Sequence, residues 1–228
     1  MQKKQMYDRY YNEFENELHR TVTSFLFWKC LNDRPHGDKS VLAALNKTPT
    51  SWLTARHALH VTFFITLGRI FDKRKDAFTV ITLLKYCENN IEIFSKNNLR
   101  ERKLADFRDE PDGLDDYISN AYEPTKKDFE GLISQTETYK ELFNDIYQPI
   151  RHKLIAHKSK SHLDKADELY KQTRIDDVNQ ILEFLNSIKE ALFYLYMNGR
   201  KPDLSAYRLD REFYENDFND LMELLKNA

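Results

Sequence analysis

A group of basic residues between Gln148 and Lys160 holds the side chains in this chain that are best suited to chemistry. The segment reads QPIRHKLIAHKSK and contains neither Asp nor Glu. A histidine titrating near neutral pH can both accept and donate a proton. An arginine can bind a phosphate through two parallel hydrogen bonds and stabilise charge that develops in a transition state. Arg151 and His157 are therefore a candidate pair for phosphate chemistry. RNA supplies its own nucleophile, the 2′-hydroxyl, so such a pair needs neither a metal ion nor a serine.

The other basic residues of this segment are candidates for supporting roles. We expect His152 and Lys153 to support the pair, and Lys158 and Lys160 to bind neighbouring phosphates of RNA in a salt-dependent manner. The alternative is a solvated helix face, because cations are favoured near the C-terminal end of a helix dipole. Spacing alone favours this alternative.

The expected geometry of the segment points to a second copy of the chain. On an α-helix, Arg151 and His157 lie about 60° to either side of Leu154 and about 9 Å apart along the axis. Within one molecule the two side chains would struggle to reach the same atom. If Leu154 packs against the same helix of a second copy, a two-fold axis brings two arginines and two histidines together. We therefore expect a homodimer with a shared site.

Helices are expected to position these residues. The chain of 228 residues has only five Gly and six Pro, fewer than strands joined by tight turns require. Apolar residues recur at intervals of three and four, which is typical of amphipathic helices. Helices are expected at about 4–31, 51–71, 79–89, 125–147, 173–198 and 211–226, with a connector over residues 32–50. Thr125 and Asp128 are expected to form a capping box at the start of the fourth, and Gly199 is well placed to end the fifth. Shorter helical pieces are expected at 41–45, 91–94 and 99–103. At Pro149 we expect a kinked continuation of the preceding helix, because proline removes one backbone donor.

These elements predict an all-α bundle that forms a single domain over residues 1–228. The helix at about 211–226 is expected to be appended to it. Residues 105–124 carry seven acidic residues against one basic residue, together with Pro111, Gly113 and Pro124. This composition predicts a long acidic loop inserted into the bundle.

Composition indicates a soluble cytoplasmic protein. The formal net charge of −2 gives no global argument for a nucleic-acid partner, so any such argument is local. Cys30 and Cys87 are the only cysteines, too few for a disulfide framework or a zinc site of their own. No apolar stretch is long enough to cross a bilayer, so no membrane partner is expected. His57 and His60 have a spacing that permits metal binding, but no third ligand is obvious, and neither a metal nor another cofactor is expected.

Three segments resemble a known family. Arg151-His-Lys-Leu-Ile-Ala-His157 resembles the R-x4–6-H signature of HEPN domains, all-α proteins found among bacterial toxins and antiphage systems. Trp52-Leu-Thr-Ala-Arg-His-Ala-Leu59 and Leu67-Gly-Arg-Ile-Phe-Asp72 resemble the AbiU-like HEPN branch, which is associated with abortive infection. The resemblance covers roughly residues 21–198. It implies a HEPN-like bundle and a homodimeric, metal-independent endoribonuclease with Arg151 and His157 as the catalytic pair.

The resemblance leaves several points open. The family commonly has Asn or Asp after the arginine, whereas His152 here adds a third titratable group, so the acid and base roles stay unassigned. Some HEPN toxins carry a tyrosine that a partner nucleotidyltransferase modifies. Ser159 stands at that position here, so an antitoxin or regulatory protein, if it acts, is expected to use another mode. Arg56 and Asp72 fall in the matching segments and are candidates for lining the site or for structural ion pairs. The rival functions are a catalytically inactive HEPN scaffold that binds RNA or a protein, and a plain helical structural protein.

Overall fold

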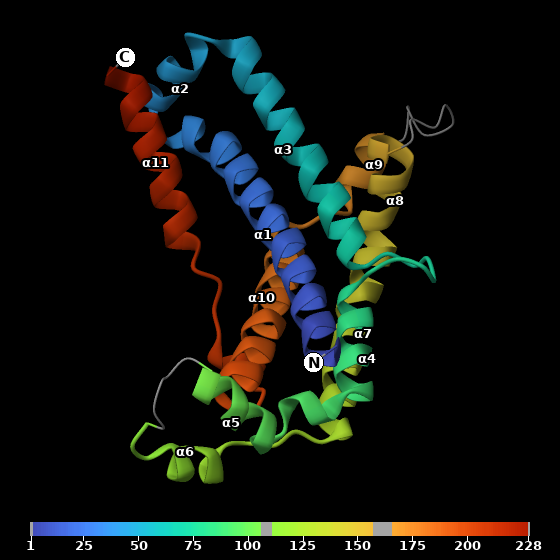
Figure 1. Ribbon diagram of the computed structural model, residues 1–228. Helices are drawn as coiled ribbons and strands as arrows, with labels where there is room; N and C mark the ends of the chain where they lie inside the picture. Colours follow the sequence, from blue (N-terminus) through green and yellow to red (C-terminus); the bar gives the residue numbers. More distant parts are fainter. Residues whose placement is uncertain (1, 106–110, 157–165, 228) are drawn as a thin grey trace. The chain divides into compact units, whose positions relative to one another are not determined.

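The computed structural model describes residues 2–105, 111–156 and 166–227 (Figure 1). Within these ranges every element of regular secondary structure is helical, so the predicted all-α class is confirmed. The helices of the first half of the chain are α1 (Gln2–Gly37), α2 (Lys39–Asn46), α3 (Pro49–Ile70), α4 (Val80–Asn89), the 3₁₀-helix η1 (Ile91–Phe94), α5 (Lys96–Ala105) and α6 (Leu114–Asn120). Those of the second half are α7 (Lys126–Leu142), the π-helix η2 (Phe143–Tyr147), α8 (Gln148–Ile150), the π-helix η3 (Arg151–Ala156), α9 (Ala166–Lys171), α10 (Ile175–Asn198), the 3₁₀-helix η5 (Leu204–Ala206) and α11 (Arg211–Asn227).

The region between the first two long helices is more helical than expected. Helix α1 runs on to Gly37 with Pro35 in its last turn, where the missing N–H removes only one hydrogen bond before the helix ends. Asp38 then caps α2, because its carboxylate accepts a hydrogen bond of 2.8 Å from the backbone N–H of Ser40. The expected connector is therefore a helix end followed by a short capped helix.

Contacts group the chain into two compact units, each built from three segments. The first unit comprises residues 1–15, 70–144 and 174–209, and the second comprises 16–69, 145–173 and 210–228. The prediction of a single domain over the whole chain stays a prediction. The Arg151 segment and α3, except for Ile70, belong to the second unit.

An aromatic core holds the first unit together. Tyr7 of α1 is 2% exposed and packs against Phe94 and Tyr196, with ring centroids 5.4 and 4.4 Å apart. The Tyr7 hydroxyl donates a hydrogen bond to the backbone carbonyl of Leu192 in α10. Such buried rings contribute both apolar area and favourable ring–ring geometry. Tyr7 therefore fixes the N-terminal part of α1 onto α10.

The ends of two helices in the first unit follow local sequence signals. The carboxylate of Asp128 accepts a 2.7 Å hydrogen bond from the backbone N–H of Thr125, which confirms the predicted capping box at the start of α7. Gly199 ends α10 with φ of +60°, a conformation that favours glycine. A β-carbon there would also lie 2.7 Å from the Cβ of Ala121, so side chains are excluded on two grounds.

The acidic region is not a loop throughout, so the prediction of a long acidic loop over 105–124 is wrong for α6. Leu114 and Ile118, one helical turn apart, are buried and pack with Leu99 of α5. This four-residue spacing gives α6 an apolar face despite its acidic neighbours. Residues 106–110 of the predicted loop lie outside the described residues.

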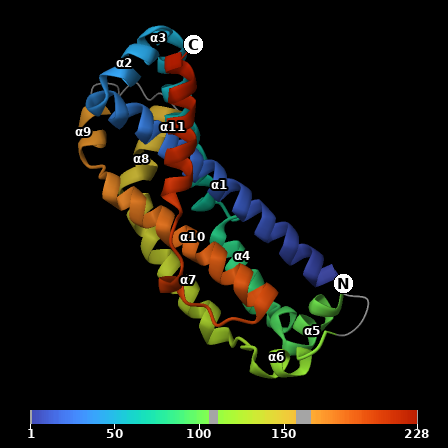
Figure 2. The same cartoon turned by 90° about the vertical axis from the view of Figure 1, so that its left-hand side faces the viewer.

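The second unit has a separate apolar cluster to which the last helix contributes. Cys30 and Leu31 of α1 and Val41 and Leu45 of α2 are buried together with Phe218 and Met222 of α11. Helix α11 lies alongside α2 in two views of the molecule (Figures 1 and 2). The appended C-terminal helix therefore completes the core of this unit. No helix among the described residues is long and apolar enough to cross a membrane.

Candidate functional site

Arg151 begins the π-helix η3, which directly follows α8. α7, η2, α8 and η3 follow one another directly from Lys126 to Ala156, which confirms that the helix continues past Pro149. A π-helix uses i→i+5 hydrogen bonds and is frequent at functional sites. The separations of about 60° and 9 Å expected between Arg151 and His157 assume α-helical geometry, whereas Arg151–Ala156 is a π-helix. His157 lies outside the described residues, so these separations stay a prediction. Proline lacks a backbone N–H, which gives a local reason for the altered hydrogen bonding on both sides of Pro149.

The side chain of Arg151 lies against Gly68 in the C-terminal half of α3. A β-carbon at position 68 would be 2.2 Å from Nε, 2.3 Å from Cδ and 2.9 Å from Cζ of Arg151. Real β-carbons do not come this close to another heavy atom, because interiors are already packed to van der Waals contact. The absent side chain of Gly68 thus creates the space that Arg151 occupies, and we call this contact the Gly68 slot.

Aromatic packing fixes the two helical segments on which the slot depends. Phe64, one turn before Gly68, lies 6.4 Å from the ring of Tyr147 between ring centroids. Phe64 and Tyr147 are 3% and 1% exposed, and Ile150 is fully buried next to Arg151 in sequence. Rotamers in such a packed environment have few alternatives. Buried apolar side chains therefore hold the backbone that carries Arg151 in place.

The charge of Arg151 is not neutralised within the part of the chain that the structure describes. Its Nε is buried and has no hydrogen-bond partner there, and no carboxylate there forms an ion pair with its guanidinium group. By contrast Arg69, the residue after Gly68, pairs with the buried carboxylate of Glu17 at 3.1 Å, and Arg20 pairs with the same carboxylate at 3.2 Å. An arginine held in place without a counter-ion can receive an anionic group from outside.

Only part of the predicted site can be located. His152 is exposed, and Lys153 and Leu154 are partly exposed on η3. His157, Lys158 and Lys160 lie outside the described residues. The pairing of Arg151 with His157 and the two-fold axis beside Leu154 therefore stay predictions.

Each of the two residues proposed to line the site has described surroundings, and their part in the site stays a prediction. Arg56 precedes Gly68 by about 18 Å along the axis of α3 and lines a pocket at the other end of that helix. Asp72 belongs to the first unit, where its carboxylate accepts hydrogen bonds from the backbone N–H and Nε of Arg74 at 2.9 and 3.3 Å. For Asp72 the described contacts match the alternative of a structural ion pair.

His60 lies on α3 between Arg56 and Gly68, within a cluster of aromatic rings. The rings of Trp28, Phe64 and Tyr170 have centroids 5.3, 5.0 and 5.8 Å from the imidazole. Burial lowers the pKa of His60, and the nearby His57 lowers it further. The described residues contain no group of three or more side chains that could hold a metal ion.

Sequence reasoning missed Gly68 as part of the site. A glycine inside an apolar helix costs roughly 1 kcal/mol relative to alanine, so its presence there asks for a structural reason. That cost was the available signal, but nothing in the sequence shows which side chain fills the space.

The chain matches the family model of AbiU2, a HEPN family, over residues 4–221. It belongs to the AbiU2 family of HEPN proteins. The match includes all three segments on which the resemblance rests and extends beyond the expected 21–198, so the predicted family is confirmed. No curated protein and no solved structure gave a significant match.

Proposed function

We propose that this AbiU2 family member is a metal-independent endoribonuclease of the toxin or antiphage-defence type. The observation that carries the proposal is the state of Arg151. Its guanidinium group is held in the Gly68 slot, and within the described residues it has no carboxylate partner. It begins the Arg151–His157 segment that resembles the HEPN signature, in a chain that belongs to a HEPN family.

In this proposal the phosphodiester of RNA is cleaved by its own 2′-hydroxyl. A histidine takes the proton of the 2′-hydroxyl while the 2′-oxygen forms a bond to phosphorus and the bond to the 5′-oxygen breaks. A second proton donor protonates the departing 5′-oxygen. The products are a 2′,3′-cyclic phosphate and a 5′-hydroxyl. His157 is proposed as general acid or base, and Arg151 stabilises the charge on the phosphoryl oxygens.

The site is proposed to be shared by two copies of the chain. Leu154 is an apolar residue three positions after Arg151, and it remains partly exposed in the single chain. Packing it against a second copy would bury this surface and bring two Arg151–His157 pairs to one axis. His152, Lys153, Lys158 and Lys160 would then surround the bound RNA with positive charge, which makes affinity depend strongly on salt.

Cleavage assays with single variants test the catalytic roles. Purified protein is incubated with RNA in EDTA alongside Arg151→Ala and His157→Ala, with Arg20→Ala as a matched control on an exposed face of α1. We expect cleavage by the wild type and the control, and losses of about 100-fold or more in the two site variants. RNA binding without cleavage by the wild type would instead favour the inactive scaffold. If the wild type neither bound nor cleaved RNA, a plain helical structural protein would be the remaining function.

A variant at Leu154 tests the shared site. Leu154→Asp places a charge on a partly exposed position, so the fold of the single chain should tolerate it. We expect sedimentation to change from dimer to monomer and cleavage to be lost, while the circular dichroism of the helices is unchanged. A monomeric wild type with full activity would contradict the shared site without touching the assignment of Arg151.

A further inference from the structure

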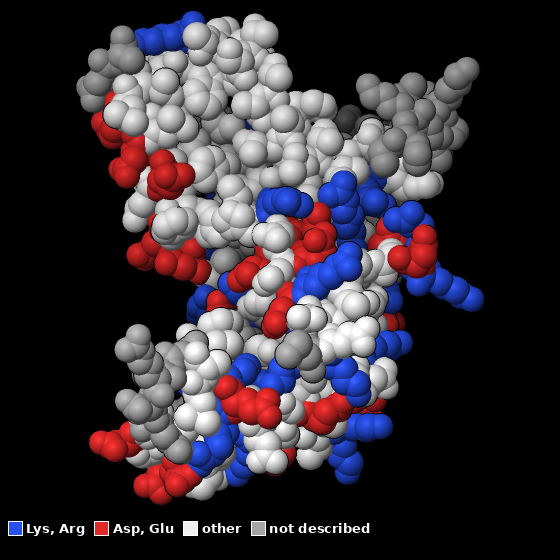
Figure 3. Space-filling model, viewed as in Figure 1, with Lys and Arg blue, Asp and Glu red and all other residues white. Residues whose placement is uncertain are grey.

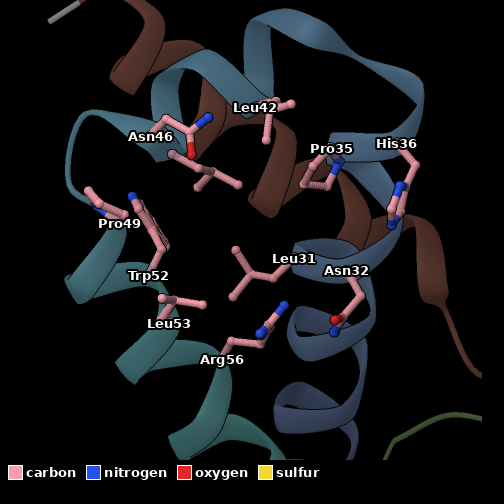
Figure 4. A pocket seen from close by; sticks show the side chains of 11 residues that line it. Leu31, Asn32, Pro35, His36, Leu42, Asn46, Pro49, Trp52, Leu53 and Arg56 are labelled. Carbon is pink, nitrogen blue, oxygen red and sulfur yellow. The ribbon is translucent and has the colours of Figure 1, made fainter.

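A pocket of about 300 Å³ lies where the end of α1, α2 and the start of α3 meet (Figure 4). Leu31 of α1, Leu42 of α2 and Trp52 and Leu53 of α3 face it. Of its seven other described lining residues three are also apolar and four, including Arg56, are polar. Leu42 and Leu53 are 43% and 56% exposed, so apolar side chains meet solvent at its rim. The volume is at the lower end of the range for small-molecule sites, and an apolar lining with a few polar groups is their usual composition.

The formal charge among the described lining residues of the pocket is positive. Arg56 and His36 line it, and none of its described lining residues is Asp or Glu. The guanidinium group of Arg56 extends toward Leu31 and Asn32 of α1 (Figure 4). The surface over α2 and the first half of α3 is otherwise mostly uncharged (Figure 3).

The ion pairs of the neighbouring helices avoid Arg56. Lys29 pairs with Asp33 at 2.7 Å and Arg34 pairs with Glu215 at 3.6 Å. Over the residues that the structure describes, no carboxylate pairs with Arg56. The cation at the pocket is thus left for an anion from outside, whereas Lys29 and Arg34 are already paired.

We propose that this pocket binds a small molecule with a short aliphatic body and one anionic group, such as an alkyl carboxylate or an alkyl phosphate. The aliphatic walls would bury the chain, and Arg56 would hold the anionic group through charge-assisted hydrogen bonds. The small volume favours a short chain over a membrane lipid. This site is separate from the Gly68 slot, and its test does not depend on RNA cleavage.

Calorimetric titration of the full chain with four probes of equal chain length tests the proposal. The probes are octanoate, octyl phosphate, 1-octanol and octylammonium. We expect one or both anions to bind with a Kd below about 1 mM, 1-octanol to bind about tenfold more weakly, and octylammonium not to bind. Comparison of the two anions identifies the preferred head group. Trp52 lines the pocket, so its fluorescence should change with the same Kd.

Two variants locate the binding. Arg56→Gln should weaken the anion about tenfold and leave 1-octanol unchanged, whereas Arg20→Gln, outside the pocket lining, should change neither. Leu53→Trp should fill the rim and weaken all binding; because Leu53 is half exposed, the fold should tolerate it. The proposal is overturned if no anion binds at about 10 mM, if octylammonium binds as well as octanoate, or if both variants bind octanoate like the wild type.

Discussion

Two arginines without carboxylate partners in the described structure lie near opposite ends of α3, and their surroundings differ. Arg151 reaches the C-terminal half of α3, where it fills the slot left by Gly68 and where its Nε is buried. Arg56 stands in the N-terminal half of α3, exposed at the rim of an open apolar pocket. Both are cations that an anion could approach, but only Arg151 is confined by backbone and aromatic packing.

This difference separates two uses of the same side chain. A cation whose position is fixed before the substrate arrives needs no reorganisation to stabilise a transition state, and this is the condition for strong electrostatic catalysis. An exposed cation adapts to ligands of different shape, at the cost of ordering its side chain on binding. The confined arginine therefore suits catalysis and the exposed arginine suits ligand binding. The following variants test this contrast.

The largest effect on stability is expected from Gly68→Ala, together with a loss of activity. The added methyl group needs the space that Nε and Cδ of Arg151 occupy, so the guanidinium group must move. If Arg151 is catalytic, the cleavage rate should fall about 100-fold, because small displacements of a catalytic group are that costly. The free energy of unfolding should fall by about 1–3 kcal/mol from overpacking. Quenched time courses of RNA cleavage measure the rate, and urea denaturation measures the free energy of unfolding.

Two further variants show whether the effect arises at Arg151. Gly131→Ala in α7 meets nothing within 4 Å, so it should retain activity and stabilise the chain by about 0.5–1 kcal/mol. Combining Gly68→Ala with Arg151→Ala removes the clash, so the loss of stability should be smaller than the sum of the single losses. Strict additivity would mean that the contact with Arg151 is not what makes Gly68 necessary.

The sequence was informative wherever a signal is local. Intervals of three and four predicted the main helices, Thr125 and Asp128 predicted the start of α7, and Gly199 predicted the end of α10. The same reasoning failed at residues 114–120, because a count of acidic residues hid the apolar face formed by Leu114 and Ile118. Average composition therefore predicts a helix less well than the spacing of two apolar side chains, Leu114 and Ile118, one turn apart.

The candidate site was predictable only in its residue types. The spacing of Arg151 and His157 marks the segment, but its three-dimensional geometry was derived from an α-helix, and the structure has a π-helix there. The partner of Arg151 is a glycine far away in sequence, and a missing side chain leaves no chemical pattern to search for. Arg56 was grouped with Arg151 by resemblance, yet α3 carries it about 18 Å from the Gly68 slot.

A moderate effect on stability is expected when each arginine is replaced by methionine. Arg151→Met keeps an unbranched apolar chain in the Gly68 slot and removes a donor that is buried without a partner. We expect its free energy of unfolding to rise by about 1 kcal/mol while activity is lost, as at sites where function is kept at the expense of stability. Arg56→Met should change the free energy of unfolding by less than about 0.5 kcal/mol, because Arg56 is exposed. Urea denaturation at one protein concentration measures both, and a marked destabilisation by Arg151→Met would show that the guanidinium group is stabilised where it lies.

The smallest effect is expected at His60, which stands on α3 between the two arginines. Burial among Trp28, Phe64 and Tyr170 lowers its pKa in the folded chain below the ordinary value of about 6.5. The unfolded chain therefore binds the proton more readily, so stability is fully present above pH 6.5 and decreases as pH falls below it, until the folded form is protonated too. His60→Gln should remove this dependence, by less than about 1 kcal/mol between pH 7 and pH 5. Urea denaturation at both pH values measures it, with His36→Gln as the control outside the aromatic cluster. If the free energy of unfolding of His60→Gln depended on pH as that of the wild type does, protonation of His60 would not destabilise the folded chain. The aromatic rings around His60 would then not keep this part of α3 neutral.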